Sequence, residues 1–509
     1  MGCARLRLHA RLHGDARCPL SALRLPMSLG RRVASATGLL TASSMLVRLL
    51  SLLTLPILTR LLDPQAYGNA ALVGTAIALL GVVALLGLDM SYARAYHSTD
   101  GPGAAKVEHF VWRVALVAAM ATGILGAIGW WLLAPRIDAR AEYGAFILVG
   151  VVLSVAQTMS QTKARLENRY RGMAFSLVAS GVFSALLAIA VAWWWRNDAY
   201  ALLLSMLGGY LVVVAALGFP SVGTLFAPAQ MKASEKRAIL GIGLAGSITA
   251  PMFWVLSSLD RWFLGAMEGT AAAGIYSVGY NLSIFGTMVS GAISAVWLPE
   301  ASRLFEANRE SARDQLGALM EKLIVLLAIV WLAVVAAGGD ALRLLAAPAF
   351  HSAAAVVPFI AGAIFFNGVL QLANAGNLLA RQLHLTLAWW LAGALLCVVM
   401  NLLLIPRWGM LGAAITQTCS FALVAAGNWI QAQRGFHLHL RSRRLLAVLG
   451  AIVGLSVLMY PPWLANPAFS LALKFPVGFA IAAGSALLID PHETLAFMKK
   501  CCTWKGVWT

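Results

Sequence analysis

Apolar residues along this chain gather into blocks of about twenty, the length at which a helix crosses the hydrocarbon core of a bilayer. Turn-forming pairs such as Asp63-Pro64 and Pro461-Pro462 separate many of the blocks. The pattern predicts an all-α polytopic membrane protein with fourteen transmembrane helices. We expect these helices over residues 36–60, 69–92, 110–134, 144–163, 172–195, 199–220, 238–266, 273–299, 317–339, 354–378, 384–405, 410–433, 445–464 and 470–489.

Composition agrees with a membrane protein. Apolar residues make up 60% of the chain and charged residues 11%, whereas soluble domains average about 45–50% and about 25%. The formal charge of +18 would indicate a nucleic-acid partner in a soluble protein. In a membrane protein the same excess is expected, because Lys and Arg collect in cytoplasmic loops. We therefore expect a phospholipid bilayer as the surroundings and no nucleic acid as a partner.

The distribution of Lys and Arg predicts the orientation. With a cytoplasmic N-terminus, the fourteen spans place 29 of these residues on the cytoplasmic side and 7 outside, and leave Arg48 and Arg261 within helices. Such an excess marks the cytoplasmic side of a membrane protein. A multi-pass protein of the bacterial inner membrane with both termini in the cytoplasm is therefore expected.

The first 26 residues are rich in Arg, contain no apolar stretch and precede a second methionine, Met27. They are not a secretory signal, and we expect translation to begin at Met27. The expected division is a basic cytoplasmic N-terminus over 1–35, a six-helix bundle over 36–220, a basic cytoplasmic linker over 221–237, a second six-helix bundle over 238–433, two further helices over 434–489 and a cytoplasmic tail over 490–509.

The short loops disfavour an enzyme. No segment between predicted helices exceeds about twenty residues, which is too few for a folded domain outside the bilayer. The six cysteines include no C-x-x-C spacing, so neither zinc nor redox chemistry has support. We expect no catalytic residue, no metal site and no cofactor. Transport is the function that this pattern favours.

A faint internal echo links two loops. Residues 61–68 contain an acidic residue, a short polar turn and a Tyr close to a Gly, and residues 266–276 contain the same features. Two related six-helix halves would explain the echo, with a transport site between them. The alternative is that any short hairpin loop uses Gly, Asp and Pro, and the echo alone does not decide between the two.

Three segments carry a family resemblance. They are residues 43–68, residues 260–265 followed by 273–277, and residues 401–414. In this order and at these separations they resemble the Wzx-type oligosaccharide flippase family of the multidrug/oligosaccharidyl-lipid/polysaccharide (MOP) superfamily. The resemblance covers roughly residues 28–490.

The resemblance implies a V-shaped pair of six-helix bundles with alternating access, followed by two additional helices. It implies a flippase that moves undecaprenyl-pyrophosphate-linked oligosaccharides from the cytoplasmic to the periplasmic leaflet. The glycan would serve exopolysaccharide, O-antigen or capsule synthesis, with a polysaccharide polymerase and a chain-length regulator as further partners. Coupling to protons or sodium ions is open.

Charged residues within the predicted helices are candidates for the pyrophosphate site. Arg48 lies midway along the first helix, where an Arg costs about 2.5–3.5 kcal/mol unless it faces a cavity or a partner. A guanidinium suits bidentate binding of phosphate. The alternative is a structural ion pair with Asp89 of the second helix. Arg94 follows Asp89 at the inner end of that helix, and we expect the two to orient each other or a gate.

Asp260 and Arg261 form the second group of candidates. Adjacent helical residues point about 100° apart, so this pair cannot share one face. Asp260 is a candidate for coupling to protons or sodium ions, since a carboxylate responds to burial and to a nearby Arg. For Arg261 the alternative is a side chain that snorkels to the membrane interface.

Polar residues in two predicted helices are candidates for contacts with sugar. A stripe at helical spacing on the tenth helix is either cavity lining or a set of hydrogen bonds between helices. The candidates are Tyr276, Tyr280, Asn281, Asn367, Gln371 and Asn374.

Three rival functions are open. A multidrug or cation exporter of the same superfamily would need acidic residues in its cavity, whereas the candidate here is an Arg. A flippase for lipid II, the peptidoglycan precursor, also uses cavity arginines. Against it, Gly279-Tyr280-Asn281 lies where we would expect a charged pair. A membrane glycosyltransferase or polymerase is disfavoured by the short loops.

Overall fold

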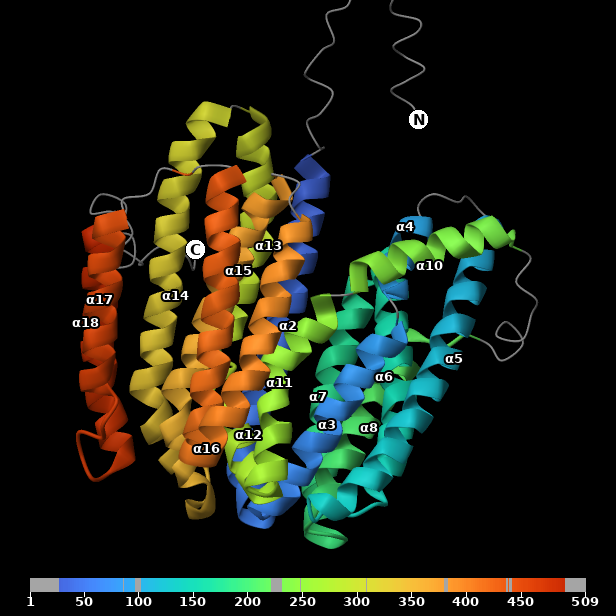
Figure 1. Cartoon of the computed structure of the whole chain (residues 1–509), viewed down its shortest axis with the longest axis horizontal. Coiled ribbons are helices and arrows are strands. Elements are labelled where there is room, and N and C mark those ends of the chain that lie inside the picture. The colour runs from blue at the N-terminus through green and yellow to red at the C-terminus, as the bar shows by residue number, and fades with distance from the viewer. Residues whose placement is uncertain are drawn as a thin grey trace, which may run out of the picture.

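The computed structural model describes residues 27–85, 87–96, 102–220, 231–247, 249–307, 309–379, 383–435, 438 and 442–489 (Figure 1). Every secondary-structure element in these ranges is a helix, which confirms the all-α prediction. Within them, 10 helical segments are long and apolar enough to cross a membrane; the count of fourteen stays a prediction. The predicted leader, most of the linker (221–230) and the tail from residue 490 lie outside the described residues.

The first half of the chain forms one bundle. A buried cluster that includes Trp112 and Trp130 packs its interior. Its elements are α2 (Met27–Leu61), α3 (Pro64–Leu85), α4 (Leu88–Tyr96), α5 (Pro102–Leu133), the short 3-10 helix η2 (Ala134–Arg136), α6 (Tyr143–Leu166), α7 (Tyr170–Trp194) and α8 (Ala199–Leu217).

The second half forms another bundle. Its longest helix, α16, contains one non-helical residue, Gly409 (φ 53°), and the chain doubles back there, between the predicted spans 384–405 and 410–433. The elements are α10 (Ala233–Ser247), α11 (Thr249–Met267), α12 (Thr270–Ser283), α13 (Gly286–Ala307), α14 (Arg309–Leu345), the 3-10 helix η3 (Pro348–Val356), α15 (Val357–Leu379), α16 (Leu383–Gly435), α17 (Ser442–Met459) and α18 (Pro467–Ile489).

Three of the predicted spans are broken. The block 69–92 divides into α3 and α4 at Gly87 (φ 65°), 238–266 divides into α10 and α11, and 273–299 divides into α12 and α13. At the first break, a Cβ on Gly87 would lie 2.2 Å from the carbonyl oxygen of Gly243, so backbones touch where α3 ends. Apolar blocks set the length of a segment, but they carry no signal for such breaks, which depend on contacts between helices.

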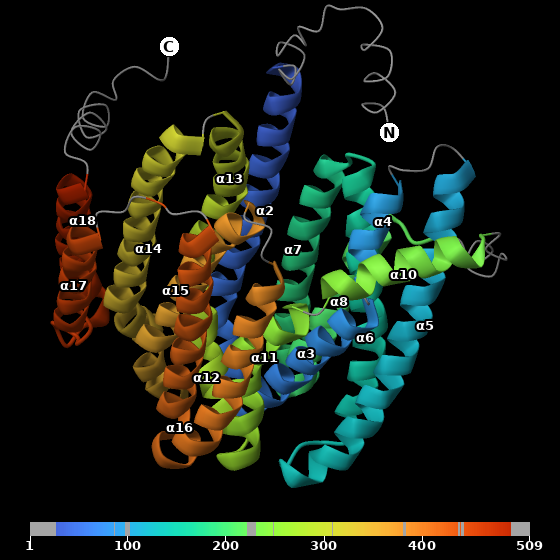
Figure 2. The ribbon, with the colours of Figure 1, turned by 45° about the horizontal axis from the view of Figure 1, so that its top comes forward.

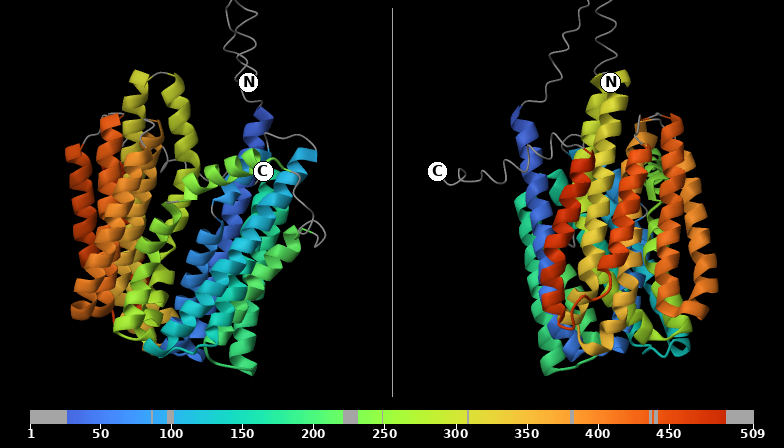
Figure 3. Two further views of the ribbon diagram at one scale, coloured as in Figure 1. Left: turned by 45° about the vertical axis from the view of Figure 1, so that its right-hand side comes forward. Right: turned by 90° about the vertical axis from the view of Figure 1, so that its left-hand side faces the viewer.

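The two bundles lie side by side and lean apart toward the end where α2 begins and α18 ends (Figures 1 and 3). They converge at the opposite end, where α3 and α12 pack against each other. Helix α2 lies between α7 of its own bundle and α13 of the other (Figure 2). This V shape agrees with the expected arrangement. The side of the membrane on which the two described ends lie stays a prediction.

A reciprocal pair of glycines joins α3 to α12. A Cβ on Gly68 would lie 1.7 Å from the oxygen of Thr270, and a Cβ on Gly274 would lie 1.9 Å from the oxygen of Pro64. Pro64 and Thr270 are the first residues of their helices, so each glycine is the fifth. Only glycine lets two helix backbones approach this closely. The echo between the two loops therefore corresponds to two helices, α3 and α12, whose first turns cross in direct backbone contact.

Candidate functional site

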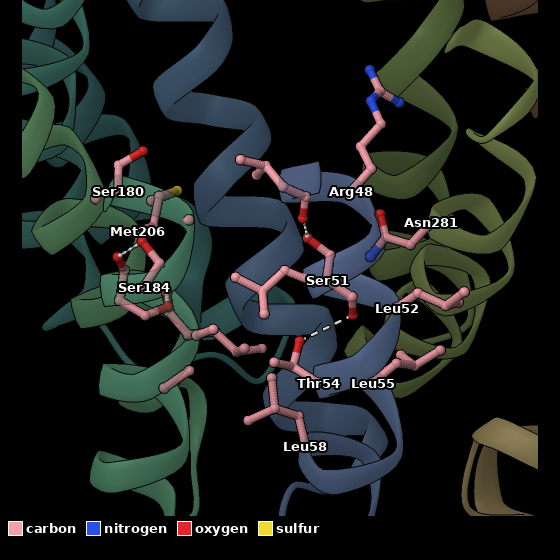
Figure 4. A pocket seen from close by; sticks show the side chains of 18 of the residues that line it. Arg48, Ser51, Leu52, Thr54, Leu55, Leu58, Ser180, Ser184, Met206 and Asn281 are labelled. Atoms are coloured by element: carbon pink, nitrogen blue, oxygen red, sulfur yellow. Dashed lines mark hydrogen bonds between the residues drawn. The ribbon is translucent and has the colours of Figure 1, made fainter. Parts of the chain in front are cut away.

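A cavity of about 530 Å³ lies between α2, α6, α7 and α8 on one side and the junction of α12 and α13 on the other (Figure 4). The side chains that line it come from both bundles, so the site exists only where the halves of the chain meet. Two of the predicted site residues, Arg48 and Asn281, are among them.

Arg48 is half-buried on α2, and its head group extends toward the α12–α13 segment (Figure 4). Its Nη1 donates to the carbonyl oxygen of Ile284 at 3.2 Å and to the hydroxyl of Thr287 at 2.9 Å. It forms no ion pair with any described side chain, so the alternative of a structural pair with Asp89 is not realised. Both partners are neutral, and the positive charge of Arg48 in this cavity is not neutralised by them.

Small polar side chains line the wall opposite Arg48. Figure 4 shows Ser180 and Ser184 of α7 across the cavity from Ser51 and Thr54 of α2. Sequence reasoning missed this wall, because a serine or threonine in an apolar helix usually bonds a carbonyl of its own helix, as Ser51 does at 3.0 Å. Gln157 of α6 was missed too, and its buried Oε1 has no hydrogen-bond partner. No described residue that lines the cavity is Asp or Glu.

Asp260 lies outside this cavity, inside the second bundle, with 1% of its surface exposed. Its Oδ2 accepts a hydrogen bond of 2.5 Å from the hydroxyl of Tyr276, and Oδ1 accepts from the backbone N–H of Arg261 at 2.8 Å. The hydroxyl of Tyr276 also approaches Oε1 of Gln417 at 3.3 Å. The carboxyl is therefore held by α11 and α12, and Gln417 of α16 lies beside its tyrosine partner.

Arg261 is buried beside this carboxyl and does not snorkel, since only 5% of its surface is exposed. Its guanidinium carbon lies 4.1 Å from the centre of the Tyr280 ring, a cation–π distance. Its Nη1 donates to the carbonyl oxygen of Ser257 at 3.1 Å. Asp260, Arg261 and Tyr276 thus form one buried group that the half-buried ring of Tyr280 adjoins. The sequence predicted the two charged residues and the two tyrosines as separate sites, and their contact with each other was not anticipated.

The predicted stripe on α15 lies away from the cavity. The amide oxygen of Gln371 accepts a hydrogen bond from Ser294 of α13, which is a contact between helices. Asn374 has a buried Oδ1 without a hydrogen-bond partner, and Asn367 is half-buried. None of the three lines the cavity between the bundles.

Asp89 and Arg94 lie on α4, which packs against α5 and α10. Asp89 is half-buried and Arg94 is exposed. The two form no ion pair with each other in the part of the chain that the structure describes, and neither lines the cavity.

More than half of the chain matches a known protein family. Residues 33–305, more than half of the chain, match the family described as polysaccharide biosynthesis protein. The chain belongs to the polysaccharide biosynthesis protein family. The matched part covers α3 to α12 with almost all of α2 and α13, and therefore includes Arg48, Asp260 and Arg261. No curated protein matches the chain.

Solved structures show where this polysaccharide biosynthesis protein belongs by fold. The lipid II flippase MurJ in an inward closed conformation superposes with a TM-score of 0.66 and 10% identity, covering 90% of this chain and 99% of that one. An inward-facing MATE-family multidrug transporter of the MOP superfamily gives 0.56 and 15%, covering 80% and 96%. A mutant of the Vibrio cholerae MATE transporter VcmN gives 0.52 and 13%, covering 80% and 97%. The family match and this shared fold together confirm the predicted relationship to the MOP superfamily.

A second hollow in this family member is an apolar groove of about 740 Å³ on the second bundle. Helices α14, α15, α16 and α17 form it, with Trp331, Phe365 and Val457 among its walls. The few polar side chains that line it belong to Trp331, Thr418, Ser456 and Tyr460. An apolar groove of this size accommodates a hydrocarbon chain better than a sugar or a phosphate.

Proposed function

We propose that the chain is a flippase that moves an oligosaccharide linked to undecaprenyl pyrophosphate from the cytoplasmic to the periplasmic leaflet by alternating access. The observation that carries the proposal is the cavity between the bundles, where Arg48 presents a cation that no described carboxylate neutralises. The anionic head group cannot cross hydrocarbon without such a partner.

Each part of this cargo has a matching surface in the structure. Arg48 suits the pyrophosphate, because a guanidinium binds phosphate oxygens through parallel hydrogen bonds. The hydroxyl wall, with Ser180 and Ser184, suits a glycan. The groove beside Trp331 suits the polyprenyl tail, which gains free energy wherever it stays out of water.

The lack of an acidic group in the cavity bears on the rival functions. An exporter of cationic drugs would need a carboxylate there to offset the cation, and none of the described lining residues supplies one. A lipid II flippase would carry the same pyrophosphate and polyprenyl groups, so Arg48 favours both flippases equally. The two cargoes differ in their sugars and in the peptide of lipid II.

Asp260 is the residue we assign to energy coupling. It is buried and forms no ion pair with any described side chain. Its hydrogen-bond donor Tyr276 also lies within hydrogen-bonding distance of Gln417. A carboxyl in such surroundings can bind a proton or a sodium ion, and either would change its hydrogen bond to Tyr276. This assignment stands apart from the cargo: the cavity site does not include Asp260.

Reconstitution tests the proposal directly. The full chain is placed in vesicles with a fluorescent undecaprenyl-pyrophosphate-linked oligosaccharide or with labelled lipid II, and transfer between leaflets is measured by quenching from one side. We expect the oligosaccharide to be flipped and lipid II to be flipped at least about tenfold more slowly. Equal rates, or transfer of lipid II alone, would favour the rival flippase. An imposed pH or sodium gradient then identifies the coupling ion, with Asp260→Asn as the variant that should not respond.

A further inference from the structure

The carbonyl group that Arg48 contacts lies at a break between two helices. Helix α12 ends at Ser283 and α13 begins at Gly286, with Ile284 as the residue that caps α12. The oxygen of Ile284 accepts hydrogen bonds from the backbone N–H of Thr287 at 2.9 Å and from its hydroxyl at 2.6 Å. Arg48 adds a third donor to the same oxygen and a bond to the same hydroxyl.

This contact joins the two bundles. Arg48 belongs to α2, which packs against α7 of the first bundle, whereas Ile284 and Thr287 belong to the second. The last carbonyl groups of a helix carry partial negative charge, so a cation placed there is favourable. A pyrophosphate anion in the cavity would compete for the same guanidinium with full negative charges, which form stronger hydrogen bonds than neutral oxygens do.

We propose that Arg48 is a latch between the bundles that the anionic head group of the cargo releases. This proposal rests on the proposed function, because it assigns a second task to the same cavity residue. In the empty protein, Arg48 holds the α12–α13 break to α2. When a diphosphate takes up the guanidinium, Ile284 and Thr287 lose their bonds to the first bundle, and the bundles are free to move relative to each other.

The latch lies at the end of the helix that also contacts the buried acid. Counting back along α12 from Ile284, Tyr280 is one turn away and stacks on Arg261, and Tyr276 is a further turn away and bonds to Asp260. The N–H of Ile284 donates to the oxygen of Tyr280 at 3.0 Å, so the α12 hydrogen-bond ladder continues up to the latch. Binding of cargo at Arg48 and binding of an ion at Asp260 therefore act on one helix from two positions.

Thr287→Val separates the latch from the cargo site. Valine has the shape of threonine without its hydroxyl, so the change removes one partner of Arg48 and leaves its charge in the cavity. Thr122→Val is the matched control, because the Thr122 hydroxyl on α5 bonds only to carbonyl oxygens of its own helix. Arg48→Ala removes latch and cargo site together.

The experiment uses the full chain in lipid nanodiscs with inorganic pyrophosphate as the probe. Spin labels on unnatural amino acids at Arg165, at the exposed end of α6, and at Gln315, exposed on α14, report the distance between the bundles. Calorimetry gives the affinity for pyrophosphate. We expect Thr287→Val to bind pyrophosphate about tenfold more tightly than the wild type, since a competing hydrogen bond to a charged group is gone.

The spin-label distances between the bundles should distinguish the same variants as the pyrophosphate affinities do. Thr287→Val keeps the bond from Arg48 to the carbonyl oxygen of Ile284. Without pyrophosphate it should therefore already populate part of the distance distribution that the wild type reaches only with pyrophosphate, while Thr122→Val should behave as the wild type in both measurements. If the wild type binds pyrophosphate through Arg48 but Thr287→Val matches Thr122→Val, the latch is refuted and the proposed function stands. If pyrophosphate binds neither the wild type nor Thr287→Val, the proposed cargo fails, and release by cargo fails with it.

Discussion

Arg48 and Asp260 are both charged residues within predicted transmembrane helices, yet the structure treats them in opposite ways. Arg48 is half-buried at a cavity, and its partners are two neutral oxygens on the other bundle. Asp260 is enclosed by its own bundle, and a tyrosine hydroxyl and a backbone N–H satisfy it. The difference teaches that a charge can serve a bulky ligand only where it borders a cavity and its own protein leaves it incompletely satisfied, whereas an enclosed carboxyl can serve only a proton or a small ion.

Lys474 and Asp340 are a third case and the most completely satisfied of the three. Lys474 of α18 lies 2.8 Å from the carboxylate of Asp340 on α14, and both side chains are almost entirely buried. Ser470 donates to the same carboxylate at 2.8 Å. Lys474, near the start of the predicted span 470–489, is one of the seven residues that the charge count takes as lying outside. The structure instead uses it to hold α18 against α14.

Replacing Arg48 should have the largest effect on transport. We expect Arg48→Ala and Arg48→Lys each to abolish complementation of a flippase-deficient strain, because neither keeps a bidentate donor for the pyrophosphate. Protein levels and the thermal unfolding midpoint in detergent should stay within the range of the wild type, since the lost contacts are to neutral oxygens beside a cavity. Growth of the strain with Arg48→Ala at wild-type levels would contradict the assignment.

Replacing Lys474 should have the largest effect on stability. Lys474→Met leaves Asp340 buried without its cation, which we expect to cost about 3–5 kcal/mol. Thermal unfolding in detergent measures this, with Glu300→Gln as the control, because Arg303 of the Glu300–Arg303 pair is exposed and such surface pairs contribute little to stability. The double variant Lys474→Met with Asp340→Leu should recover most of the loss. Equal unfolding midpoints for Lys474→Met and Glu300→Gln would show that the buried pair contributes no more to stability than the surface pair does.

Removing the Tyr276 hydroxyl should have a smaller effect on stability. Tyr276→Phe deletes the 2.5 Å hydrogen bond to Asp260 and leaves the ring in place. A buried bond to a charged group contributes about 1.5–3 kcal/mol, so the unfolding free energy should fall by that amount.

Flipping driven by an ion gradient separates two roles for the carboxyl. If Asp260 carries the ion, Asp260→Asn stops gradient-driven flipping whereas Tyr276→Phe only slows it; if its role is structural, both reduce stability and leave the response to the gradient intact.

Much of the architecture could be predicted from the sequence, because the length of an apolar block follows from the thickness of a bilayer and the short loops leave no room for a further domain. The helix breaks could not, since the break between α12 and α13 has no charge or proline of its own, and its Ile284 and Phe285 are apolar. Arg48 was found because a charge within an apolar block is costly. Gln157 was missed because its isolated position in α6 gave no periodic signal, and only the packing of α6 beside α2 shows that it faces the cavity.

Gln157 supplies the smallest and most specific test of the contrast between satisfied and unsatisfied groups. Its Oε1 is buried without a partner, on the same cavity that Arg48 lines, so it resembles Arg48 rather than Asp260. We expect it to accept a hydrogen bond from a sugar hydroxyl. Gln157→Leu should then reduce flipping of the oligosaccharide about five- to tenfold, the cost of one hydrogen bond, and leave pyrophosphate affinity unchanged. Asn374→Leu is the matched control, since its Oδ1 is also buried without a partner but lies away from the cavity. If the two variants slow flipping equally, Gln157 is an unsatisfied packing residue, and incomplete satisfaction marks the cargo site only for charged groups.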